Sequence, residues 1–177
     1  LPLIAKSWQI SDDLKTWRFH LNKNIVFHDG TGLTAQDILF TFKTVKNMSS
    51  SINANSFENI ESIEFINDHE LVFHLKKPDQ TFAQTLRRTY IAPSHLFNSD
   101  GKPKDDTYYK APVGSGSFKV LKFGPKKCVL EKNKSYYRGL AKLEKIIISV
   151  YENERSLLSD LINEKIDISF TLSLIHI

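Results

Sequence analysis

The chain has 177 residues, of which 41% are hydrophobic and 25% are charged, and its formal net charge at pH 7 is +4. This composition is typical of a globular domain with a core of its own, and it excludes a chain that is disordered throughout. No run of about 18 apolar residues occurs, so the sequence predicts no membrane-spanning helix.

The excess of positive charge does not by itself indicate a nucleic-acid partner. Acidic residues are interspersed among the lysines, and the densest group of lysines lies on a predicted hairpin. This group comprises Lys119, Lys122, Lys126, Lys127, Lys132 and Lys134. A solvated strand face accounts for such a group without a ligand, so we expect no nucleic acid to bind.

The single cysteine, Cys128, excludes an internal disulfide. It lies in an apolar strand without a neighbouring base, which is typical of a small hydrophobic residue and not of a nucleophile. The sequence also contains no recognisable nucleophile–base pair, zinc-binding helix or paired catalytic acid. We therefore expect no catalytic residues and no enzyme activity.

The first elements along the chain are predicted to be strands. Residues 3–10 form one, and residues 16–21 alternate between apolar and polar side chains with the period of a half-buried strand. The apolar face of the second strand carries Trp17, Phe19 and Leu21. A short strand is expected at 25–28, before the glycine-bearing turn 29–32.

A helix is predicted over residues 34–48. Thr34 can cap it through its hydroxyl group, and Asp37, three residues later, can accept a hydrogen bond from the amide of the capping residue. The carboxylate also lies at the positive end of the helix dipole. Ile38 and Phe42 belong to a broad apolar face, which indicates that one side of the helix is buried.

The remaining elements suggest a mixed architecture. In order, they are a hairpin of strands 60–66 and 70–76, short helices at 81–88 and 93–97, an exposed loop at 98–110, a hairpin of strands 116–123 and 127–132, a strand at 143–150, a helix at 153–164 and a strand at 166–169. The middle of the chain resembles antiparallel meanders, and its end is strand–helix–strand. The sequence therefore predicts an α/β fold of the mixed α+β kind.

Four segments, in order along the chain, carry a resemblance to a known family. They are Ala5-Lys6-Ser7-Trp8 with residues 10–42, then Tyr90-Ile91-Ala92-Pro93-Ser94-His95-Leu96, then Pro112-Val113-Gly114-Ser115-Gly116-Ser117-Phe118-Lys119, and last residues 130–146 with 163–168. Together they resemble family 5 of the extracellular solute-binding proteins, which are dipeptide, oligopeptide and nickel receptors of bacterial ABC importers. Asn24 replaces a common glycine, and Gly32 and Ser117 each replace a common proline, but all three suit turns.

The resemblance implies a periplasmic-binding-protein-like fold of class II, in which two lobes close on a ligand. Residues 1–170 would be part of the first lobe, with a mixed sheet, antiparallel meanders and flanking helices. The first strand of this lobe would precede residue 1, and the second lobe would follow residue 169. The missing initiator Met also suggests that residue 1 is a cut end.

By the same resemblance, the expected function is that of the substrate-binding component of a bacterial ABC importer. It would bind peptides, deliver them to permease subunits in the membrane, act as a monomer and need no cofactor. The expected location is the periplasm or the cell surface, with a lipid anchor in the second case.

Residues 171–177 are expected to be a non-native tail. The sequence of residues 172–177 is also what the transposon end used in sequencing libraries encodes in frame. We therefore interpret this tail as adapter read-through, which would also explain an end inside a domain.

The candidate ligand-binding residues are Tyr90 and the loop of Gly114, Ser115 and Gly116. The loop can offer backbone amides to a ligand or allow a close approach of its backbone, and the ring of Tyr90 can line a peptide groove. The pair Tyr108 and Tyr109 can do the same, although packing explains these two tyrosines better.

A metal site is a weaker possibility. His20 and His28 lie on neighbouring predicted strands, and Asp29 follows His28, so the three side chains can in principle converge on a metal ion. A polar strand face and a structural turn explain the same residues better. We therefore expect no metal site.

Three alternatives remain open at this point. The first is a receptor for nickel or another small solute, because proteins that bind these ligands share the family fold. The second is the solute-sensing module of a transcription regulator, which a helix-turn-helix before residue 1 would indicate. An unrelated hydrolase would reveal itself by turnover of a peptide.

Overall fold

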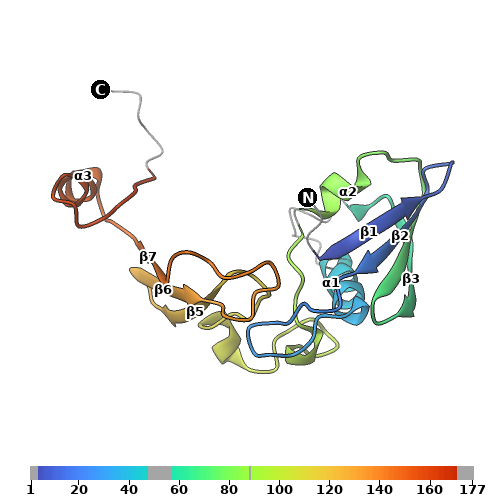
Figure 1. Cartoon of the computed structure of the whole chain (residues 1–177), viewed down its shortest axis with the longest axis horizontal. Coiled ribbons are helices and arrows are strands. Elements are labelled where there is room, and N and C mark those ends of the chain that lie inside the picture. Colours follow the sequence, from blue (N-terminus) through green and yellow to red (C-terminus); the bar gives the residue numbers. More distant parts are fainter. Residues whose placement is uncertain (1–3, 48–56, 88, 171–177) are drawn as a thin grey trace.

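The computed structural model describes residues 4–47, 57–87 and 89–170. These residues form two antiparallel sheets that lie apart and are joined by a connection containing α2 (Phe82–Leu86) and the 3-10 helices η2 (Ser94–Leu96) and η3 (Asp106–Tyr109) (Figure 1). The tail at 171–177 lies outside the described residues, so its assignment as read-through stays a prediction.

The first sheet has four strands in the order β1-β2-β4-β3. Their bounds are β1 Ala5–Ile10, β2 Thr16–Leu21, β3 Ile60–Asn67 and β4 Glu70–Leu75. In β2, buried side chains that face the core alternate with half-buried ones, as a sheet covered on one face requires. In β4, Val72 is buried as well as Leu71, Phe73 and Leu75. Trp17 pairs with Phe73 and Phe19 with Leu71, so large apolar residues face each other across the two central strands.

The helix α1 (Ala35–Asn47) covers the inner face of this sheet. Its start has the predicted capping arrangement: the Thr34 amide donates to Asp37 Oδ2 at 2.9 Å, and the Gln36 amide donates to Thr34 Oγ1 at 3.3 Å. Ile38 and Phe42 then pack on the sheet, and Phe42 meets Phe73 with ring centroids 5.2 Å apart. The predicted apolar face of the helix is therefore confirmed.

The second sheet has three strands, β5 (Phe118–Phe123), β6 (Lys127–Lys132) and β7 (Lys145–Ser149), in that order. The helix α3 (Glu154–Ile162) follows and stands at the far end of the molecule (Figure 1). The lysines of the β5–β6 hairpin pair in part with carboxylates, as in Lys119–Glu131 and Lys132–Glu144. This pairing fits a solvated strand face.

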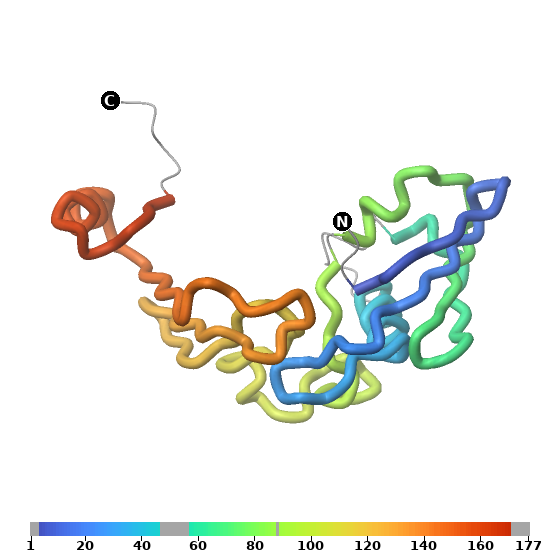
Figure 2. Tube along the Cα trace, viewed as in Figure 1, coloured from blue at the N-terminus to red at the C-terminus, as the bar shows by residue number. Residues whose placement is uncertain are grey.

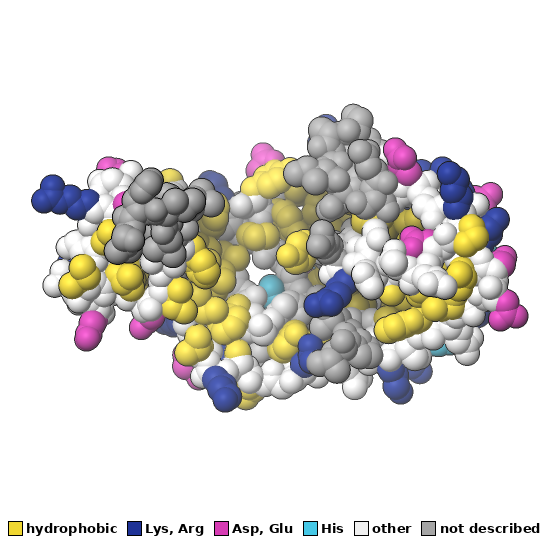
Figure 3. Space-filling model, turned by 90° about the horizontal axis from the view of Figure 1, so that it is seen from above, with side chains coloured by type: hydrophobic (Ala, Val, Ile, Leu, Met, Phe, Trp, Pro, Cys, Tyr) yellow, Lys and Arg dark blue, Asp and Glu magenta, His cyan; other side chains and the backbone are white. Residues whose placement is uncertain are grey.

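Large apolar side chains remain exposed throughout this second unit. They are Leu121, Phe123, Leu140, Leu143, Ile147, Ile148, Val150, Leu158, Ile162, Ile168 and Phe170. Figure 3 shows hydrophobic side chains gathered on the half of the molecule that holds β5–β7 and α3. None of the fully buried hydrophobic residues of the described ranges comes from this half, because all of them lie between Trp17 and Pro93.

Four expectations about the elements and the sheet differ from the structure. Residues 25–28 form no strand, because only one bridge, Val26 to Gly32, closes a tight loop there. Residues 166–169 pair with no strand, and every strand pair in the described ranges is antiparallel, so the expected mixed sheet is not seen in them. The segment 98–110 is not a plain loop, since it contains η3.

Candidate ligand-binding site

The two units meet where the loop 22–33 lies against the segment that leads into the second sheet. Ile25, Phe27 and Leu33 are buried in this loop, and Val113 and Tyr137 pack against them. Figure 2 shows the same approach, with the loop running beneath the segments that flank the second sheet. We call these five residues the joint. The candidate loop Gly114–Gly116 directly follows Val113 of the joint, so the joint fixes its position.

His28 binds the candidate loop at three points. Its backbone amide donates to the Gly114 carbonyl at 2.7 Å, and the Gly114 amide donates to His28 Nδ1 at 3.1 Å. The third contact joins His28 Nε2 to the Gly116 carbonyl at 3.1 Å. Both nitrogens of the half-buried imidazole are therefore used to hold a backbone that is 86 to 88 residues away in the sequence.

These partners determine which nitrogen of His28 carries the proton. An amide N–H can only donate, so Nδ1 must accept and carries no hydrogen, while a carbonyl can only accept, so Nε2 must carry the hydrogen. The ring is therefore neutral. Burial lowers the pKa of His28 below its ordinary value, and the nearby Lys119 acts in the same direction, whereas the hydrogen bond to Gly116 and the charge of Asp29 oppose them.

Asn133 holds the other end of the candidate loop. It is only 5% exposed, and its Nδ2 donates to the Gly116 carbonyl at 2.8 Å. Its backbone amide donates to the Ser117 carbonyl at 2.9 Å. The sequence did not single out His28 or Asn133 as supports of this loop, and the only available signal was that both lie in segments resembling the family.

The loop leaves two backbone donors without a partner. Among the described residues, the amides of Ser115 and Gly116 make no hydrogen bond, whereas the Gly114 amide is taken by His28. A Cβ atom added at Gly114 would lie 3.5 Å from His28 Cε1, and one added at Gly116 would lie 3.8 Å from the Phe118 carbonyl oxygen. The described chain therefore does not crowd either glycine. Neighbouring free amides of this kind suit a carboxylate or a carbonyl oxygen.

Tyr90, the other candidate residue, has interactions that are separate from those of the candidate loop. Its side chain is 95% exposed, whereas the next residue, Ile91, packs against both apolar clusters. The Ala92 amide donates to the buried Thr41 Oγ1 at 2.9 Å, which fixes the path of this segment over α1. Within the described ranges, no hydrogen bond or ring contact joins Tyr90 to the candidate loop.

The other candidate residues take structural roles. Tyr108 packs edge-on against Phe97 with centroids 4.9 Å apart, and its hydroxyl donates to the Val113 carbonyl at 3.4 Å. Burial raises the pKa of Tyr108. The ring of Tyr109 is mostly exposed and lies next to that of Tyr108. Packing thus explains Tyr108, as expected.

The histidines do not converge on a metal site. His20 lies near Glu70 on the first sheet, at 4.0 Å, whereas His28 holds the candidate loop. Asp29 pairs with His95 at 2.7 Å. Burial would raise the pKa of Asp29, but hydrogen bonds from Thr31 and His95 hold it below its ordinary value. Among residues 4–47, 57–87 and 89–170, no group of three or more His, Cys, Asp or Glu side chains could hold a metal ion.

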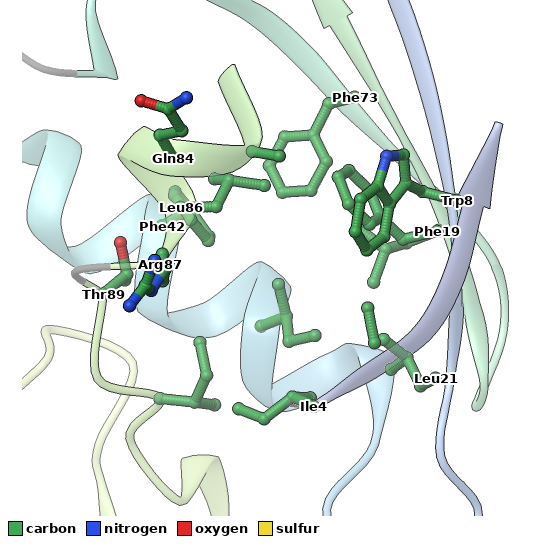
Figure 4. Close-up of a pocket in the computed structure, with 15 residues that line it drawn as sticks. Ile4, Trp8, Phe19, Leu21, Phe42, Phe73, Gln84, Leu86, Arg87 and Thr89 are labelled. Carbon is green, nitrogen blue, oxygen red and sulfur yellow. The ribbon is translucent and has the colours of Figure 1, made fainter. Parts of the chain in front are cut away.

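The first unit also contains an open cavity of about 320 Å³. Trp8, Phe19 and Leu21 form one side of it, and Phe42 and Leu86 face them (Figure 4). The polar ends of Gln84, Arg87 and Thr89 lie at the side away from β1 (Figure 4). Such walls suit apolar atoms and offer few partners to the backbone of a peptide. We therefore place the candidate site at the loop 114–116 and not in this cavity.

The chain matches the model of a protein family over residues 1–176, and the family is described as bacterial extracellular solute-binding proteins, family 5 Middle. The chain belongs to this family. Within the described residues, no helix has the length and apolar character needed to cross a membrane.

Two curated relatives illustrate the similarity. A putative ABC transporter peptide-binding protein of Brucella ovis is 31% identical over 149 residues, which cover 81% of this chain and 28% of the relative. The probable ABC transporter periplasmic-binding protein SapA of Escherichia coli is 22% identical over 190 residues, which cover 95% of this chain and 35% of SapA. The chain thus spans about a third of the length of these relatives.

Solved structures agree in fold. NikZ from Campylobacter jejuni, in complex with Ni(L-His), has a TM-score of 0.85 and 28% identity, covering 94% of this chain and 34% of NikZ. The oligopeptide-binding protein AppA from Bacillus subtilis, in complex with a nonapeptide, has a TM-score of 0.81 and 26% identity, covering 93% of this chain and 34% of AppA. The expected class of fold, that of the family 5 solute-binding proteins, is therefore confirmed.

Proposed function

We propose that the protein containing this chain is the substrate-binding component of a bacterial ABC importer, that it binds peptides, and that it delivers them to a membrane permease. The observation that carries this proposal is the family match over residues 1–176, together with relatives named as peptide-binding proteins. A receptor of this kind binds its ligand and catalyses no reaction. The proposed location is the periplasm or the lipid-anchored cell surface, and the proposed state is a monomer.

Within this proposal, Gly114, Ser115 and Gly116 contact the ligand. The free amides of Ser115 and Gly116 would receive a carboxylate or carbonyl oxygen of a peptide, and the absence of side chains at the two glycines leaves room for the peptide backbone. Backbone-to-backbone hydrogen bonds of this kind accept varied side chains. Tyr90 is the second candidate for ligand contact, because its exposed ring can stack on a ligand.

The test is calorimetric titration of the full-length protein with the tetrapeptide Ser-Thr-Ser-Ala. The same peptide is bound by the periplasmic binding protein DppA of Helicobacter pylori. We expect saturable binding without cleavage of the peptide. Appearance of free amino acids during the titration would favour the hydrolase alternative, and a helix-turn-helix before residue 1 would favour the regulator.

A nickel receptor is the second candidate, and the similarity to NikZ in complex with Ni(L-His) favours it. NikZ holds nickel together with histidine, so the ligand proposed for this candidate is a nickel complex of an organic chelator. Titration with nickel and histidine together, compared with nickel alone, distinguishes this candidate from the peptide receptor.

A further inference from the structure

His28 is the side chain that ties the first unit to the candidate loop through both of its ring nitrogens. We propose that neutral His28 is a positioning residue that holds the Ser115 and Gly116 amides in the orientation that binds the ligand, so that uptake of a proton by His28 weakens binding. This inference rests on the proposed role of the loop 114–116 in ligand contact.

The geometry makes the arrangement dependent on the protonation state. The His28 and Gly114 backbones are joined in both directions, since the His28 amide donates to the Gly114 carbonyl and the Gly114 amide donates to Nδ1. A protonated imidazole carries hydrogens on both nitrogens and can no longer accept. Protonation would therefore place two N–H groups against each other at 3.1 Å and release this end of the loop.

The charged groups around His28 act in opposite directions. Lys119 on β5 disfavours the proton, and Asp29 next in the chain favours it. The carboxylate of Asp29 is already paired with His95 and accepts from the Thr31 amide at 3.0 Å. Tyr137 of the joint stays neutral because burial raises its pKa.

The direction of the pH effect follows from these surroundings. Burial lowers the pKa of His28 in the folded protein, so the unfolded chain takes up this proton first as the pH falls. The stabilisation by the hydrogen bonds between His28 and the loop 114–116 is therefore complete above the ordinary pKa of about 6.5. It is lost as the pH falls through the lower pKa that His28 has in the folded protein. Binding should be constant above neutrality and should weaken in acid.

The binding experiment uses the full-length protein and Ser-Thr-Ser-Ala at pH 7.5 and pH 5.0. The wild type should bind more weakly at the lower pH, by the factor by which the neutral fraction of His28 falls, because only molecules with a neutral His28 are competent. The His28→Asn variant keeps an acceptor near the Nδ1 position but does not titrate, so it should lose most of this pH dependence. The control His74→Asn, which removes an exposed histidine paired with Glu64, should retain it.

A second variant, His28→Phe, keeps the ring but removes both hydrogen bonds. We expect it to bind about tenfold or more weakly at both pH values while retaining the wild-type circular dichroism spectrum. An equal acid-induced loss of affinity in the wild type and in His28→Asn would overturn the proposal.

A readout without ligand separates this inference from the proposed function. Nitrogen-15 NMR of the full-length protein should show the His28 imidazole with its hydrogen on Nε2, and titration should end this state below pH 6.5. A hydrogen on Nδ1 at neutral pH would overturn the inference even if the peptide binds. Absence of peptide binding together with the expected tautomer would instead contradict the peptide proposal. In that case, loss of protection of the Gly114 amide in acid would still show that its hydrogen bond to His28 depends on the protonation state.

Discussion

A single carboxylate, Asp37, connects the start of α1 to η2. It is 4% exposed, and its two oxygens bind different segments. Oδ2 accepts a hydrogen bond from the Thr34 amide, and Oδ1 accepts from the Ser94 amide at 2.8 Å and from the Ser94 hydroxyl at 2.7 Å. The sequence predicted the first contact from the spacing of Thr34 and Asp37. The second contact joins residues 57 positions apart, and no local pattern indicates it.

The substitution Asp37→Ala should therefore destabilise the protein by about 2–4 kcal/mol, because it leaves four donors in a partly buried place without their acceptor. The measurement is urea unfolding of the full-length protein. Asp12→Ala is the matched control, since Asp12 is exposed and holds no such contact. A loss below about 0.5 kcal/mol for Asp37→Ala would show that water replaces the carboxylate.

Two glycines with positive φ differ in their surroundings. Gly101 has φ of 80° and Gly30 has φ of 91°, so both adopt a conformation that other residues avoid. A Cβ atom at Gly101 would lie 2.7 Å from Thr44 Cγ2 on α1, whereas nothing lies within 4 Å of one at Gly30. Both positions carry backbone strain in a variant, but only Gly101 adds a steric clash.

We expect Gly101→Ala to cost about 1–3 kcal/mol more than Gly30→Ala in thermal or urea unfolding. Thr44 is β-branched and held in a helix, so it cannot easily turn its methyl group away. Adding Thr44→Ser, which removes Cγ2 and keeps the hydroxyl group, should recover most of the difference. Equal costs for the two glycine variants would mean that α1 and the 98–103 turn move apart freely.

At the scale of elements, the two strands of the β3–β4 hairpin differ in burial. Phe73 in β4 is 2% exposed, and its ring lies 5.7, 5.2 and 5.2 Å from those of Phe19, Phe42 and Phe82. Phe65 in β3, by contrast, is 36% exposed. Only the tertiary structure distinguishes these two phenylalanines, since β4 is a central strand and β3 is the edge strand of the sheet.

The substitution Phe73→Ala should cost about 3–5 kcal/mol in urea unfolding, because it opens a cavity among aromatic rings that cannot close it fully. The matched change Phe65→Ala on the same hairpin should cost about 1 kcal/mol or less. Similar losses for the two variants would contradict the burial of β4 as the central strand of the core.

At the scale of the whole molecule, stability is distributed unevenly. The fully buried apolar residues all belong to the first unit and the connection that follows it, whereas the second unit presents exposed apolar side chains from β5 to the end of the described chain. A sheet of three strands without a covered face buries too little apolar surface to be stable by itself.

Hydrogen exchange of the 177-residue chain should therefore protect the amides of β2 and β4 most strongly, while those of β5–β7 and α3 exchange within seconds to minutes. In a protein of the relatives' length, about three times that of this chain, we expect the second sheet to become protected as well if further chain covers its exposed apolar side chains. Uniform protection in the short chain, with cooperative unfolding at high temperature, would contradict this view.

The sequence by itself determined the local elements and the family. Alternating side chains predicted β2, and the capping pair predicted the start of α1, because each of these signals acts over a few neighbouring residues. Its failures at 25–28 and 166–169 have one cause: a strand requires a partner, and a run of apolar residues does not reveal whether a partner exists.

The candidate site divides in the same way. The glycines at 114 and 116 were visible in the sequence, but the support that holds them was not, since His28 and Asn133 reach them across 86 and 17 residues. Only the tertiary structure decided which amides of the loop are free and which ring nitrogen of His28 carries the proton. The physical reason is that hydrogen-bond partners distant in sequence are chosen by the packing of the joint and not by local preference.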